Sequence, residues 1–244
     1  MDIRLALMTG VDIPIQELQL ILHQPTIKEI SLMGEEDFFE AIQYLCLEKE
    51  YLIEDKRVLD TLTNFQVLMK VLEQSKDKEK KIAITTLLSL LFPNYKTAIT
   101  PRSIILTSQK QNVLIDEKNF DSFQSILRKV LCTSNILQGD NVIYNPGNDK
   151  AKAIMDKLMK GRKKVAELKA KNGQQESVLG RYLSILTIGT NTMRLQDCID
   201  LTLYQLFDLI DRFNLFVNWD IDLRVRLAGG DPKQEVDNWM KEIH

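Results

Sequence analysis

The sequence has little of the chemistry that enzyme and metal sites usually need. Its 244 residues include two histidines and three cysteines, and these do not stand at the close spacing of a zinc site or of a disulfide framework. His23 lies beside Pro25, where the end of a strand accounts for it, and His244 is the last residue. The cysteines are far apart in apolar surroundings, which predicts reduced core thiols. They are Cys46, Cys132 and Cys198.

Motifs for nucleophilic or phosphate chemistry are also missing. No G-x-S-x-G motif accompanies either histidine. Gly229-Gly230 is followed by Asp-Pro rather than by the Lys-Ser/Thr of a phosphate loop. Carboxylates are frequent, but a solvated helix face explains those of residues 197–211, and pairing with neighbouring arginines explains Asp220 and Asp222. The sequence therefore predicts a protein that is not an enzyme and needs no metal or cofactor.

Long hydrophobic runs are absent as well. No stretch of about 18 apolar residues occurs, and the first residues lack a signal-peptide pattern, so we expect neither secretion nor a membrane span. A net charge of −2 with 44% hydrophobic residues is typical of a soluble globular protein. This small net charge conceals a segregation, because acidic residues dominate positions 12–55 and basic residues dominate positions 149–171.

The basic stretch is the one candidate for contact with nucleic acid. Such a patch could neutralise several phosphates, but no aromatic residue alternates with it and no recognised nucleic-acid module surrounds it. We favour a solvated helix that faces an acidic protein region, such as residues 12–55 of the same chain or of a second copy, and keep a nucleic-acid-binding regulator as an alternative. The residues of the patch are Lys157, Lys160, Arg162, Lys163 and Lys164.

Periodicities along the chain predict an α+β protein in which helices dominate. Alternating apolar residues in 3–8 and 13–22 predict two strands joined around Gly10, and Thr26 with Glu29 predicts a capping box for a short helix. Further helices are expected over 35–46, 55–74, 82–92, 119–131 and 176–189, and a small sheet is expected within 98–115. The predicted regions are an α+β body of residues 1–147, a basic helical connector of 148–175 and a helical carboxyl-terminal module of 176–244.

The last fifty residues contain the most regular pattern. Apolar residues recur at spacings of four and three from Leu195 to Val217, which predicts one long amphipathic helix reaching Leu227, with Asp208 on its solvated face. Gly229 and Gly230 would end this helix. Asp231-Pro232 would begin a short hook helix that carries Trp239 and Met240 on its apolar side. A helix that short must be covered, either by its own body or by a partner.

Two parts of the sequence resemble assembly proteins of tailed bacteriophages. The carboxyl-terminal part comprises LTLYQLFD at 201–208, DRF at 211–213, RLAGG at 226–230 and VDNWMKEIH at 236–244. The amino-terminal part comprises DIPI at 12–15, QPTIKEI at 24–30 and GEEDF at 34–38. The resemblance is to the baseplate hub or tail assembly chaperones of contractile-tailed phages.

The resemblance implies a non-enzymatic chaperone in the cytoplasm of the infected bacterium, where it binds tail or baseplate hub proteins and no membrane. A structural component that stays in the virion is the alternative within this class, and self-association is kept open. We expect contacts with other proteins to involve the side chains of Tyr204, Arg212, Trp239 and Met240, and Gly229 and Gly230 to set the angle of the hook.

Overall fold

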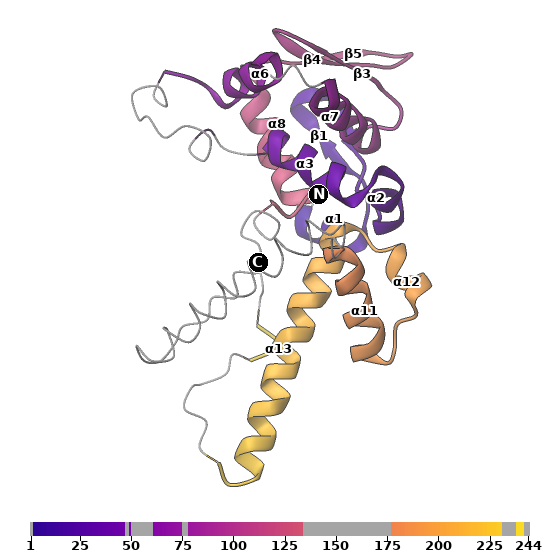
Figure 1. Cartoon of the computed structure of the whole chain (residues 1–244), viewed down its shortest axis with the longest axis vertical. Helices are drawn as coiled ribbons and strands as arrows, with labels where there is room; N and C mark the ends of the chain where they lie inside the picture. Colours follow the sequence, from indigo (N-terminus) through magenta and orange to yellow (C-terminus); the bar gives the residue numbers. More distant parts are fainter. Residues whose placement is uncertain are drawn as a thin grey trace, which may run out of the picture.

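The computed structural model describes residues 2–46, 49, 61–74, 78–133, 177–230 and 238–241. Figure 1 shows a helical body with a small sheet, β3-β4-β5, at one end of the molecule and a long helix, α13, that leaves the body and projects away from it. The protein is therefore α+β and predominantly helical, with a long carboxyl-terminal helix, as the sequence predicts.

The elements follow one another in this order along the described residues: α1 (Ile3–Thr9), β1 (Ile13–Ile15), the 3-10 helix η1 (Gln16–Leu18), β2 (Leu20–Leu22), α2 (Ile27–Met33), α3 (Glu35–Cys46), α6 (Asn64–Gln74), α7 (Lys78–Leu91), β3 (Lys96–Thr100), β4 (Ser103–Thr107), β5 (Asn112–Ile115), α8 (Phe120–Val130), α11 (Val178–Thr190), α12 (Leu195–Ile199) and α13 (Leu203–Leu227).

The predicted first strand is wrong, because residues 3–9 form helix α1. The Asp2 side chain accepts hydrogen bonds from the backbone N–H groups of Arg4 and Leu5, which satisfies donors that a helix start leaves unpaired. Gly10 ends the helix in the left-handed conformation, with φ of 69°. A helix of seven residues is too short to be stable alone, and its contact with α13 supplies the missing stabilisation.

The second predicted strand is a complete hairpin rather than one strand. β1 and β2 pair antiparallel, with Ile13 opposite Leu22 and Ile15 opposite Leu20. These four side chains are buried, whereas the alternate residues are exposed. The alternation was therefore read correctly, but the reversal at Gln19, whose φ is 52°, was missed because glutamine is not a usual turn residue.

The capping box at the start of α2 is confirmed. Thr26 accepts from the backbone N–H of Glu29, and the Glu29 carboxylate accepts from the backbone N–H of Thr26. The acidic first turn of α3 and its buried face are also as predicted, with Phe38, Ile42 and Leu45 fully buried. Local capping signals thus determined both boundaries in this part of the chain.

Helices α7 and α8 and the three-stranded sheet contribute buried residues to the same hydrophobic core. The sheet is antiparallel in the order β3-β4-β5, and its buried residues Ile104 and Leu106 lie opposite Ile115 and Val113. The ring of Phe123 on α8 stacks on that of Phe92, with centroids 6.0 Å apart, and both rings are fully buried. The three predicted strands and the helix that follows them are therefore confirmed.

Two helix starts differ from the prediction. α6 begins at Asn64 rather than at residue 55. Reciprocal hydrogen bonds join Thr63 and Gln66 at this start. Residues 51–60 are outside the described part of the chain. α7 begins at Lys78, inside the charged run of residues 76–81 that was expected to form a solvated turn and the start of the helix, and so before the predicted first helical residue, Ile82. Glutamate and lysine are good helix formers, and the charged side chains of this first turn need not be buried.

The predicted helix from Leu195 to Leu227 is interrupted. α12 ends at Ile199, and α13 begins after Thr202, whose side chain accepts from the backbone N–H of Gln205 while Gln205 accepts from the backbone N–H of Thr202. This second capping box, T-x-x-Q, is visible in the sequence but lies inside a continuous apolar pattern. The break allows α12 to pack beside α11 while α13 runs in its own direction.

The far end of α13 is closed as predicted. Gly229 has φ of 80° and donates its N–H to the Arg226 carbonyl, while Gly230 donates to the Val225 carbonyl. This pair of bonds is the Schellman motif. The hook helix expected after it falls mainly on residues 231–237, outside the described residues, and Asn238 to Lys241 form a turn in which the Lys241 N–H donates to the Asn238 carbonyl.

We predict that Phe123→Ala lowers the free energy of unfolding by about 3–5 kcal/mol, because it removes a buried ring and leaves a cavity against Phe92. Urea unfolding followed by far-UV circular dichroism measures this change. Leu32→Ala is the matched control: Leu32 is 82% exposed, so its truncation should change stability by less than about 0.5 kcal/mol. Equal effects of the two substitutions would contradict the position assigned to Phe123.

Candidate protein-contact surface

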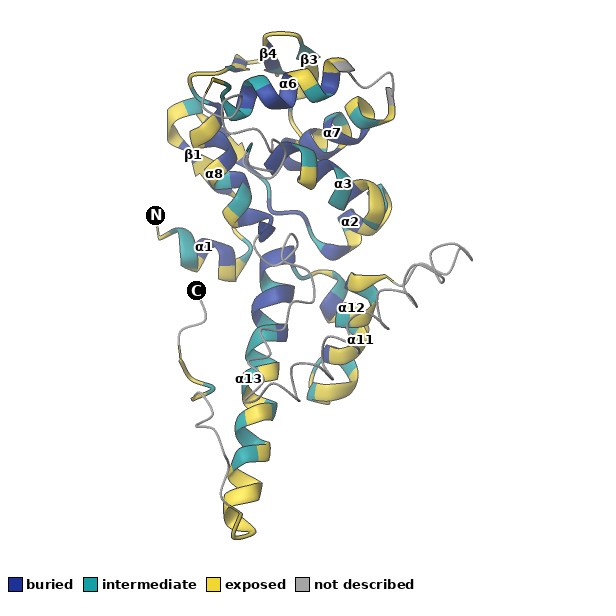
Figure 2. Cartoon of the chain, turned by 60° about the vertical axis from the view of Figure 1, so that its left-hand side comes forward, coloured by how far each residue is buried: buried dark blue, intermediate teal, exposed yellow. Residues whose placement is uncertain are grey.

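Helix α13 has two halves in different surroundings. In its first half, the side chains of Leu203, Leu206, Phe207 and Ile210 are buried by contact with α1 and α11. Figure 2 shows the colour of α13 changing from buried, where it leaves the body, to exposed along its far half. Several apolar residues of the far half are therefore exposed in the isolated chain: Phe216, Ile221, Leu223, Val225 and Leu227.

The far half presents a defined apolar stripe. Phe216, Trp219, Leu223 and Leu227 follow one another at spacings of three, four and four, so they lie along one side of the helix. Phe216 is 44% exposed and Leu227 is 79% exposed. We call these four residues the distal stripe. The sequence pattern did not single it out, because the predicted seam that ends at Val217 lies on a different side of the helix.

The turn of residues 238–241 packs on one end of the distal stripe. The ring of Trp239 lies 5.7 Å from that of Phe216 and 6.4 Å from that of Trp219. Arg212 holds this turn in place, because one guanidinium nitrogen donates to the carbonyls of Trp239 at 2.8 Å and Lys241 at 2.7 Å. The structure therefore brings together three of the predicted contact residues, Arg212, Trp239 and Met240, and Met240 is 66% exposed beside them.

The other predicted contact residues lie elsewhere. Tyr204 is buried in the first half of α13, where burial together with the nearby Asp208 raises the pKa of its hydroxyl. Gly229 and Gly230 end the helix beyond the distal stripe. Asp208 is 6% exposed, so its predicted place on the solvated face is wrong; the break before Thr202 turns this part of the helix toward the body.

The basic patch cannot be placed on this surface. Lys157, Lys160, Arg162, Lys163 and Lys164, with the whole connector 148–175, lie outside the described residues. The predicted contact of this patch with an acidic partner stays a prediction.

The cysteines are core residues, as predicted. Cys46, Cys132 and Cys198 are all buried and free. Burial raises the pKa of the Cys46 thiol to about 12 and that of Cys132 to about 12. Thiols with so little thiolate at neutral pH are poor nucleophiles.

His23 lies in a charged cluster rather than at an ordinary strand end. Its Nδ1 is 3.0 Å from the Asp12 carboxylate and its Nε2 is 3.2 Å from the Glu29 carboxylate. Both ring nitrogens can donate to carboxylates only in the charged imidazolium form. Burial opposes that charge, but the hydrogen bonds and charges of Asp12 and Glu29 outweigh it and raise the pKa of His23.

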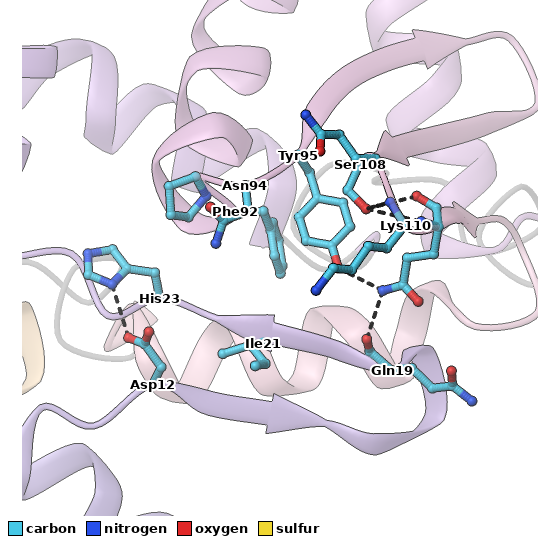
Figure 3. Close-up of a pocket in the computed structure, with 12 residues that line it drawn as sticks. Asp12, Gln19, Ile21, His23, Phe92, Asn94, Tyr95, Ser108 and Lys110 are labelled. Carbon is cyan, nitrogen blue, oxygen red and sulfur yellow. Dashed lines mark hydrogen bonds and ion pairs between the residues drawn. The ribbon is translucent and has the colours of Figure 1, made fainter.

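The cluster borders a pocket of about 840 Å³ between the β1–β2 hairpin, the segment at Phe92 and the turn around Lys110. Figure 3 shows His23 and Asp12 at one end of this pocket and Gln19 and Tyr95 nearer the other. The Gln111 side chain donates to the Tyr95 hydroxyl and to the Gln19 carbonyl. The polar groups along the wall are thus largely paired with one another.

Within the residues that the structure describes, no group of three or more His, Cys, Asp or Glu side chains could hold a metal ion. Across those same ranges, no helix combines the length and the apolar character that a membrane span needs.

The fold and this surface define an α+β protein that carries an exposed helical arm. Comparison with known proteins adds a similarity for the arm: residues 171–244 match the family described as YomV second domain, which has a phage-related name. The match supports the predicted connection with bacteriophages, but not the finer assignment to baseplate hub or tail chaperones. No curated protein and no solved structure matches the chain.

The His23 cluster predicts a pH dependence of stability. Since folding raises the pKa of His23, its contribution is complete at pH values below the ordinary histidine pKa and is lost as pH rises through the raised value. We expect wild-type stability, relative to that of His23→Gln, to fall as pH rises above the ordinary histidine pKa of about 6.5. Urea unfolding of both proteins at a series of pH values on either side of it measures the difference. A wild-type curve parallel to that of the variant would show that His23 is not held as an imidazolium.

Proposed function

We propose that the protein is a non-enzymatic assembly factor of a tailed bacteriophage, acting in the cytoplasm of the infected bacterium by binding tail or baseplate proteins. The observation that carries the proposal is the surface formed by the distal stripe with Trp239 and Met240. Aromatic and methionine side chains are enriched where one protein buries the surface of another. A few such residues usually supply most of the binding energy.

The position of this surface also favours binding to other proteins. The buried first half of α13 joins the arm to the body, and the far half extends away from it (Figure 1). Arg212 fixes the Trp239 turn against the helix, so less conformational entropy is lost when a partner covers it. The similarity of residues 171–244 to a family with a phage-related name supports the biological setting.

Recovery of tail proteins by the tagged full-length chain, produced together with the tail genes of its phage, tests the proposal. Leu227→Ser combined with Met240→Ser should weaken that recovery about tenfold, because two exposed apolar contacts are removed. Both side chains are largely exposed, so the fold should be retained. Quantitative mass spectrometry of the recovered proteins gives the ratio.

Leu32→Ser is the matched control, since Leu32 is 82% exposed on α2 in the body. It should leave recovery unchanged. Equal recovery of tail proteins by the wild type and the double variant would remove the distal surface from the mechanism. Detection of the chain in purified mature particles would instead favour the structural component that stays in the virion.

A further inference from the structure

The distal stripe is bordered by charges arranged in a particular order. Asp220 and Arg224 lie along one edge of the stripe and form an ion pair of 2.8 Å. Asp222 and Arg226 lie along the other edge and form a second ion pair, also of 2.8 Å, in which the Asp222 side chain is 10% exposed, so the Asp220–Arg224 edge is the more accessible of the two. Each edge therefore carries an acid nearer the body and a base nearer the end of the helix. Asp220 and Arg226 lie three residues before and after Leu223, and Asp222 and Arg224 lie one residue before and after it.

This order makes the surface complementary to itself in one direction. Two copies can meet at Leu223 with their α13 helices antiparallel. The edge that carries Asp220 and Arg224 then faces the same edge of the second copy, which runs in the opposite direction. Asp220 then lies within roughly 3 Å, measured along the helix axis, of the level of Arg224 in the second copy. Asp222 lies equally close to the level of Arg226 in the second copy. Arg224 and Asp222 each also approach their own counterpart at this distance, so four acid–base approaches stand against two between like charges. The apolar stripe of one copy lies on that of the other.

A parallel arrangement gives the opposite result. Each edge then faces the other edge, so Asp220 approaches Asp222 of the second copy and Arg224 approaches Arg226, and these like-charge approaches outnumber the approaches of Arg224 to Asp222 by four to two. Like charges in such positions are destabilising. The charges therefore both favour a second copy as occupant of the stripe and select its direction.

We propose that the distal stripe pairs with the distal stripe of a second copy of this chain, antiparallel and with the twofold axis at Leu223. The proposal rests on the proposed function only in treating this surface as a site of protein contact. The overlap spans about four helical turns, from Phe216 to Gly230. An interface of this size is small, which predicts a reversible dimer in the micromolar range.

Sedimentation velocity of the full-length chain between about 1 and 300 µM covers that range. We expect a monomer–dimer equilibrium for the wild type. Asp220→Arg gives one edge two bases, and Arg224→Asp gives it two acids, so each variant alone should dimerise about tenfold more weakly. An equimolar mixture of the two variants should recover the wild-type affinity, because the acids of one chain then face the bases of the other.

Glu79→Arg is the matched control for charge, since Glu79 is exposed in the body, and it should dimerise as the wild type does. Circular dichroism checks that each variant keeps its helix content. A wild type that stays monomeric throughout this range would overturn the proposal. So would an Asp220→Arg variant that dimerises as well as the wild type.

Cysteine cross-linking tests the direction. The native cysteines are buried, so an introduced cysteine is the reactive one under mild oxidation. Leu223→Cys should form a disulfide-linked dimer because this position meets itself on the twofold axis. Leu227→Cys should not, because antiparallel packing puts it opposite Trp219. Cross-linking at both positions would indicate parallel packing and contradict the proposal.

The two proposals fail separately. A monomeric wild type that still recovers tail proteins overturns the self-pairing alone. A dimeric wild type that recovers none overturns the proposed function alone.

Discussion

The structure depends on the junction at which α13 leaves the body. Thr26 and Thr202, which cap α2 and α13, are joined in an antiparallel bridge, and the N–H of Ile27 donates to the Leu201 carbonyl at 2.9 Å. The Gln205 side chain adds a hydrogen bond to the Met8 carbonyl at 2.8 Å. Because both helices begin at this point, the first half of α13 is placed in the core and the second half is directed away from it.

The junction also explains two features nearby. A side chain at Gly10 would approach Thr202 to 3.3 Å and would need a left-handed backbone, so glycine suits this position. Glu29 serves two partners, since it caps α2 through Thr26 and accepts from His23. Hydrogen bonds from Thr26 and His23 outweigh the effect of burial and lower the pKa of Glu29. The charge of His23 is thereby connected to the point where the arm attaches.

Sequence patterns predicted the elements whose signals are local. The Thr26 capping box, the buried face of α3 and the small sheet each follow from a few neighbouring residues. α1 was read as a strand because seven residues cannot show helical periodicity clearly, and only Asp2 and the contact with α13 make it helical. The break at Thr202 was missed although its capping box is visible, because the apolar pattern continues through it.

The candidate surface was predicted in part. Trp239 and Met240 were singled out as apolar residues near the end of the chain, but no pattern shows that Arg212, 27 positions earlier, binds the Trp239 carbonyl. Tyr204 looks like a contact residue in the sequence and is a core residue in the fold. Which apolar residues of an amphipathic helix remain exposed depends on how far the body reaches along it, and only the tertiary structure determines that.

The central claim is that one helix is buried against the body in its first half and, apart from the contact with the Trp239 turn, exposed in its second. Hydrogen–deuterium exchange across α13, in dilute protein where chains are separate, measures this directly. The account predicts slow exchange for amides of residues 206–213 and markedly faster exchange for those of residues 216–227, with the difference reduced at high concentration. Uniformly slow exchange along the whole helix in dilute protein would contradict it, because the far half would then be covered by the chain itself.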